Sequence, residues 1–136
     1  MLIEAMPDFC EKIRQRRKCT LFNAAASAAA GQVHFHVAEG IEELSGIHPV
    51  WLGRISPGTR TRAVVVERRT LDNMLEAAGV TRIDFISIDV EGHEPEVLRG
   101  FSIRRYRPPP RVLIGFRVAS LPLLPRRIAQ STSEYL

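Results

Sequence analysis

The stretch that decides the fold is residues 83–100, which read IDFISIDVEGHEPEVLRG. Its first half carries a nearly continuous apolar run: Ile83, Phe85, Ile86, Ile88 and Val90. Such a run predicts a parallel strand that is covered on both faces. Pro95 then suits the first turn of a helix, and Gly100 suits its end. The stretch therefore predicts a buried strand, a turn rich in acidic residues, and a short helix.

A second helix is expected directly upstream. Thr70 is a good N-cap, apolar residues follow it at helical spacing, and Gly79 suits the position just past the helix end. Downstream, residues 112–114 form one more apolar strand after the prolines at 108–110. These segments predict helices and strands in alternation.

The N-terminal half continues this alternation. A helix is expected to open at Pro7, with acidic residues in its first turn and basic residues, up to Lys18, in its last. Strands are expected at residues 2–3, 20–24, 33–37 and 63–66, and a loop at 39–60. Alternating strands and helices predict an α/β protein with a mostly parallel sheet.

Composition narrows the function classes. The chain has 136 residues, no apolar run long enough to span a bilayer, no secretory signal, and two cysteines without metal-ligand spacing. We therefore expect a cytoplasmic protein that neither spans nor binds a membrane. The net charge is +4, but no aromatic residues interleave with the basic clusters, so no nucleic-acid partner is expected. A non-catalytic, basic α/β module that binds an acidic partner stays open as an alternative function.

The candidate functional residues lie where strands end, because ligands of open α/β sheets bind beyond the carboxyl ends of the strands. Glu4 ends the first expected strand, and a carboxylate there can accept hydrogen bonds from the two hydroxyls of a ribose. The turn after residue 88 crowds four titratable groups into six residues: Asp89, Glu91, His93 and Glu94. Asp89, Glu91 and Glu94 could alternatively supply oxygen ligands to Mg²⁺. The histidines at 34, 36 and 48 are not expected to bind a metal.

Two stretches carry a family resemblance. TLDNML at 70–75 and the whole of 83–100 agree in order and spacing with "T-L-D-x-L/M-L" and "I-D-hydrophobic-hydrophobic-K-I-D-V-E-G-x-E-x-x-V-L-x-G". Weaker similarity covers EAMPDF at 4–9, NAA at 23–25 and residues 31–37. The chain thus resembles FkbM-type methyltransferases from residue 2 to about residue 114.

The resemblance implies a Rossmann-like class I methyltransferase fold that binds S-adenosyl-L-methionine. Glu4 would hold the ribose, Asn23 and Ala24 would lie near the adenine, and Asp89 would also contact the cofactor. Asp89, Glu91 and His93 would form the catalytic group, with His93 as the expected base and Asp89 as the alternative. The implied reaction is O-methylation of a hydroxyl on a saccharide or another small molecule.

The chain also departs from the family pattern. Ser87 stands where the family commonly has lysine, and no "D-x-G-A-x-x-G" loop precedes Glu4. We therefore expect residues 1–115 to be a partial domain, incomplete at the N-terminus, that catalyses poorly alone. Residues 116–136 match nothing in the pattern and are expected to form a flexible tail.

Overall fold

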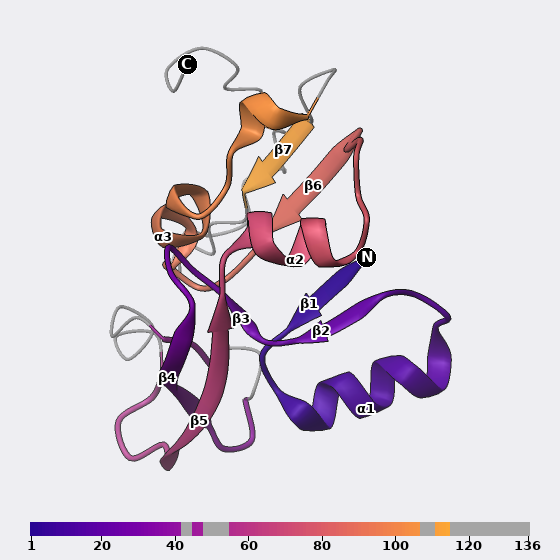
Figure 1. The fold of residues 1–136 in the computed structure, drawn as a ribbon. Helices are drawn as coiled ribbons and strands as arrows, with labels where there is room; N and C mark the ends of the chain where they lie inside the picture. The colour runs from indigo at the N-terminus through magenta and orange to yellow at the C-terminus, as the bar shows by residue number, and fades with distance from the viewer. Residues whose placement is uncertain (42–44, 48–54, 107–110, 115–136) are drawn as a thin grey trace, which may run out of the picture.

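The computed structural model describes residues 1–41, 45–47, 55–106 and 111–114 (Figure 1). The expected tail, with its boundary at residue 115, lies outside these residues, as do His48 and the prolines at 108–110. Parts of the expected loop at 39–60 lie outside them as well. Inside the described part of that loop, an isolated bridge joins His36 to Gly46.

The N-terminal unit is a strand, a helix and a second strand. β1 (Leu2–Glu4) leads into α1 (Pro7–Arg16), and β2 (Leu21–Asn23) then pairs parallel to β1. Pro7 opens α1 as predicted, because its fixed φ suits the first helical turn. The helix ends sooner than expected, since Arg17 is already extended with φ −139° and ψ 133°.

A second, three-stranded sheet follows. β3 (Ala25–Ala26) and β4 (Gly31–Ala38) flank β5 (Thr61–Arg69), in the order β3-β5-β4. The alternation predicted for residues 33–37 is confirmed in part: His34 is exposed between the half-buried Val33 and Phe35, but the strand ends in two consecutive buried residues, Val37 and Ala38. β5 is longer than the predicted 63–66, because it pairs antiparallel with β4 along that strand's full length.

The C-terminal unit contains the sequence that decides the fold. α2 (Leu71–Ala77), β6 (Phe85–Ile88), α3 (Glu94–Arg99), the 3₁₀ turn η3 (Ile103–Arg105) and β7 (Arg111–Ile114) follow in order, and β6 pairs parallel to β7. The Thr70 hydroxyl caps α2 by accepting a hydrogen bond from the backbone N–H of Asn73 at 3.1 Å. Gly79 follows the helix with φ +66°, a conformation that favours glycine.

One apolar cluster connects α2, α3, β6 and η3. Its buried members are Leu71, Leu75, Ile83, Ile88, Val97, Phe101 and Tyr106. Ile3 of β1 and Val112 of β7 pack against this cluster, so it extends across both parallel strand pairs. The close approach of α3 to the segment after β3 requires Gly100, where a Cβ atom would overlap the carbonyl oxygen of Ser27.

Two expectations about the sheet need correction. β6 is not covered on both faces, because Phe85 keeps 59% of its surface exposed. The strands also form three small sheets instead of one mostly parallel sheet, although the α/β class is confirmed. The separation has a topological cause: within the described residues, β1 pairs only with β2 and β6 only with β7.

Among the residues that the structure describes, no helix is long and apolar enough to cross a membrane.

Candidate functional site

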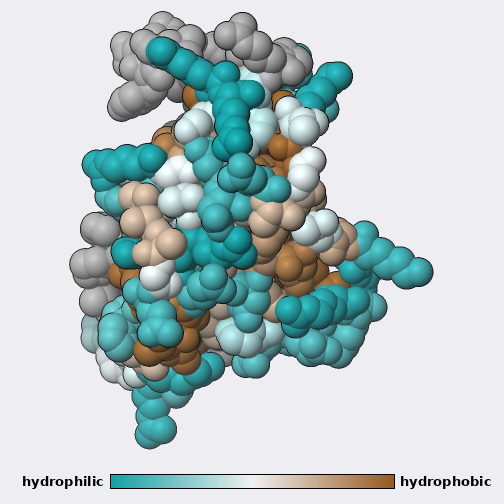
Figure 2. Space-filling view, viewed as in Figure 1, coloured by the Kyte–Doolittle hydropathy of each residue, from teal (hydrophilic) through white to brown (hydrophobic). Residues whose placement is uncertain are grey.

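A cavity of about 870 Å³ separates the two parallel strand pairs. β1 and the residues after it line one side, and β6 with the turn after it lines the other. Glu4, Ala24, Asp89, Glu91 and His93 all contribute to its wall. Five of the seven candidate residues named from the sequence therefore surround one space, and Asn23 and Glu94 do not line it. Figure 2 shows apolar surface, in brown, over the region of β1.

Glu4 is placed at the cavity by the end of β1. Its Oε1 atom accepts a hydrogen bond from the backbone N–H of Met6 at 2.8 Å, which holds the carboxylate at the entrance to α1. Burial raises the pKa of the Glu4 carboxyl above its usual range, and backbone N–H groups of Met6 and Ala5 partly oppose that shift. A half-buried carboxylate with one oxygen already positioned can accept hydrogen bonds from a polar ligand.

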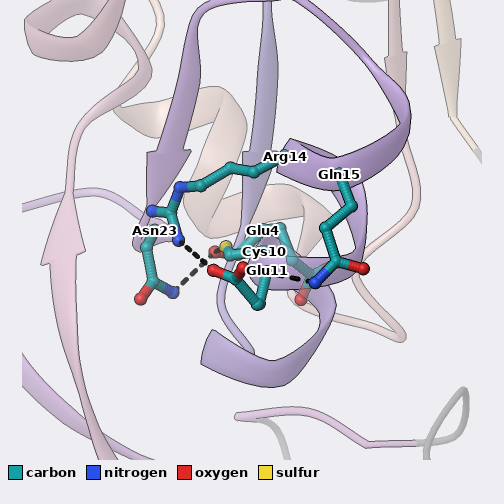
Figure 3. Close-up of polar contacts among 6 residues, drawn as sticks. All are labelled: Glu4, Cys10, Glu11, Arg14, Gln15 and Asn23. Atoms are coloured by element: carbon teal, nitrogen blue, oxygen red, sulfur yellow. Dashed lines mark hydrogen bonds and ion pairs between the residues drawn. The ribbon is translucent and has the colours of Figure 1, made fainter.

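Asn23 fixes the end of β1 (Figure 3). Its amide nitrogen donates to the carbonyl oxygens of Glu4 at 3.1 Å and Ala5 at 2.9 Å. The Cys10 thiol approaches the same Glu4 carbonyl at 3.3 Å. Asn23 thus supports the end of β1 and does not line the cavity, whereas the adjacent Ala24 is buried and does line it.

The acidic turn is held together by one of its own carboxylates. Glu94 is 1% exposed, and its Oε1 atom accepts hydrogen bonds from the backbone N–H groups of Val90 and Gly92, both at 3.2 Å. Glu91 has φ 51° and Gly92 has φ 96°, so the turn passes through the left-handed region twice. A positive φ is uncommon for a residue other than glycine, such as Glu91. Glu94 therefore shapes the turn that presents Asp89 and Glu91.

His93 contacts a residue that the sequence reasoning missed. Its Nε2 atom lies 3.0 Å from the hydroxyl oxygen of Ser27, and both residues are buried. The hydroxyl can donate to or accept from the ring, depending on the tautomer. Ser27 lies in an alanine-rich segment without a motif, so the sequence offers no signal for this pairing.

The metal alternative is not supported by the geometry. Among the residues that the structure describes, no three or more histidine, cysteine, aspartate or glutamate side chains gather closely enough to hold a metal ion. Glu94 instead directs Oε1 to backbone N–H groups, while Asp89 is exposed at the cavity.

The comparison with protein families agrees with this arrangement. A family model described as the methyltransferase FkbM domain matches residues 1–110. The chain belongs to the FkbM methyltransferase family. The match includes β1, the acidic turn and every candidate residue of this FkbM domain, and it confirms the resemblance drawn from residues 70–75 and 83–100. Comparisons with curated proteins and with solved structures gave no match.

Proposed function

We propose that this FkbM domain is an S-adenosyl-L-methionine-dependent methyltransferase of the Rossmann-like class I fold, acting on a hydroxyl of a saccharide or another small molecule. The observation that carries the proposal is the position of Glu4 and the turn at 89–93 around one cavity. Both follow the carboxyl ends of parallel strands, where α/β sheets bind their ligands. Family membership supplies the methyl-transfer chemistry.

The residues present fit such a methyl donor. Glu4 offers a half-buried carboxylate at the cavity, which suits the two hydroxyls of a ribose. The small side chain of Ala24 leaves room for a flat ring against the backbone, and apolar residues such as Met6 and Phe9 also line this end. S-adenosyl-L-methionine would supply an activated methyl group on a sulfonium centre.

The protein's own task is then to position the acceptor hydroxyl and remove its proton. We favour Asp89 as the proton acceptor, because its side chain is exposed at the cavity, whereas the buried His93 ring is hydrogen-bonded to Ser27. In this proposal His93 positions the turn and Glu91 contacts the acceptor. A carboxylate at Asp89 would take the hydroxyl proton as the oxygen forms its bond to the methyl carbon.

Calorimetric titration with S-adenosyl-L-methionine tests the donor. We expect wild-type chain to bind it and Glu4→Gln to bind at least about tenfold more weakly, because hydrogen bonds to a charged group contribute about 1.5–3 kcal/mol. Glu39→Gln is the matched control, since Glu39 is exposed and does not line the cavity. Failure of the wild-type chain to bind, or equal binding by Glu4→Gln, would count against the proposal.

The catalytic assignment has a separate test. Methyl transfer to a panel of saccharides, followed as S-adenosylhomocysteine release, should fall about 10²–10⁴-fold in Asp89→Asn, the usual contribution of a general base. The loss of transfer should exceed the loss of donor binding. Asp8→Asn is the control, since Asp8 is exposed and does not line the cavity, and unchanged transfer in Asp89→Asn would remove that residue from the mechanism.

A further inference from the structure

We infer that the guanidinium group of Arg68 is a binding site for the carboxylate of a small molecule. Arg68 lies near the end of β5, and the residue paired with it on β3 is Ala25, which lines the cavity. The site does not depend on the proposed function. Only the source of the carboxylate, which is either the methyl donor or another ligand such as an acidic saccharide, rests on that function.

Arg68 places a positive charge on an apolar face of the second sheet. Alternate residues of a strand share a face, so Arg68 lies on the same side of β5 as the buried Val66. Its sequence neighbours Glu67 and Arg69 lie on the opposite side, where they form an ion pair of 3.8 Å. Among the paired residues of β3, β4 and β5, none on the face of Arg68 is acidic.

The guanidinium has no partner within the part of the chain that the structure describes. Its Nε atom is buried there without a hydrogen bond. The two terminal nitrogens form no hydrogen bond or ion pair with a described residue either, but unlike Nε they are not buried. An arginine stays charged in a protein, and burying a polar group without a partner is unfavourable. The fold thus holds this charge in place without compensating it, as is expected where a ligand supplies the partner.

The neighbouring strands leave room beside the guanidinium. Directly across from Arg68 they carry the two smallest kinds of residue, Ala25 on β3 and Gly31 on β4. The Nη2 atom of Arg68 lies 3.6 Å from the place where a Cβ atom of Gly31 would stand. The guanidinium therefore lies against the backbone of β4, and no large side chain faces it from the paired position on either strand.

The charge at the site favours a carboxylate over a phosphate. The planar guanidinium can bind either group through two parallel hydrogen bonds. The other arginine on this face of β5 is Arg62, which lies about 20 Å away at the usual rise of a strand. A single positive charge matches the single negative charge of a carboxylate, whereas a phosphate carries about −1.5 to −2 at neutral pH.

An NMR titration of the whole chain tests the site. The probe is D-glucuronate, with D-glucose as the neutral control and glucose 6-phosphate as the phosphate arm. Glucuronate should shift the Nε–H signal of Arg68 and the amide signal of Gly31, and glucose should shift neither. Arg68→Gln should weaken glucuronate binding at least about tenfold, because it removes charge-assisted hydrogen bonds. Arg62→Gln is the matched control, since Arg62 is exposed on the same face of β5, and it should bind as wild type.

The two sources of the carboxylate are distinguished by a second titration with S-adenosyl-L-methionine. A tenfold loss of donor binding in Arg68→Gln would assign the carboxylate to the donor. A loss confined to glucuronate would assign it to another ligand. Glucuronate binding by a chain that does not bind the donor would support this site while counting against the proposed function. Equal binding of both molecules by wild type and Arg68→Gln would overturn the site.

Arg68→Met separates binding from folding. Because the charge is uncompensated, an apolar side chain of similar length should leave the midpoint of urea unfolding unchanged or raise it, while glucuronate binding is lost. A clearly lower midpoint would assign the guanidinium to the fold and overturn its role as a site. Tighter binding of glucose 6-phosphate than of glucuronate, or equal signal shifts with glucose, would also overturn the assignment. If Arg68→Gln fails to fold, the wild-type titrations and Arg68→Met still decide the question.

Discussion

His93 and Ser27 are joined by a buried hydrogen bond of 3.0 Å although 66 positions separate them in the sequence. The bond ties the turn after β6 to the segment after β3, beside the close contact of Gly100 with the Ser27 carbonyl. The acidic turn is therefore anchored to the second sheet as well as to its own strand.

Replacing Ser27 with alanine should lower the free energy of unfolding by about 1–3 kcal/mol, because the buried His93 ring would lose its hydrogen-bond partner at Nε2. Urea denaturation measures the change. Ser56→Ala is the control, since Ser56 is exposed and its side chain forms no hydrogen bond within the described residues. Equal stability of the two variants would show that the hydroxyl contributes nothing to the fold.

Glu94 and Glu96 provide a matched pair within the first turn of α3. Glu94→Ala should destabilise the chain by about 1–3 kcal/mol, because the N–H groups of Val90 and Gly92 would lose a buried acceptor. Glu96→Ala removes a surface ion pair with Arg99 and should change stability by less than about 1 kcal/mol. Thermal or urea unfolding separates the two, and the reverse ranking would contradict the structural role of Glu94.

The raised pKa of the Glu4 carboxyl predicts how the stability of the chain depends on pH. Burial raises its folded-state pKa above the unfolded-state value, so the folded chain binds the proton more tightly. Glu4 therefore destabilises the fold once pH rises through the raised pKa, and this effect is absent below the unfolded-state pKa. Glu4→Gln, which keeps an acceptor for the Met6 N–H, should be more stable than wild type at about pH 7 and equal to it at about pH 4. Denaturation across this range checks the convergence, and a constant difference would refute it.

Local chemistry made much of the fold predictable. Pro7, Thr70 and Gly79 each act within a few residues of their own position, so their effect on helix ends can be predicted from sequence. The same holds in part for the alternation in β4. The position of the acidic turn followed from its place after an apolar strand.

The remaining features depend on neighbours that are distant in sequence. Phe85 belongs to an apolar run that is typical of a covered strand, but its exposure depends on what lies beside β6. Ser27 forms its hydrogen bond to His93 across a long separation and lies in a segment without a motif. Asn23 lies in a stretch with family resemblance, but its hydrogen bonds to the carbonyl oxygens of Glu4 and Ala5 depend on the pairing of β1 with β2. The number of sheets likewise depends on strand pairing, which an individual strand does not encode.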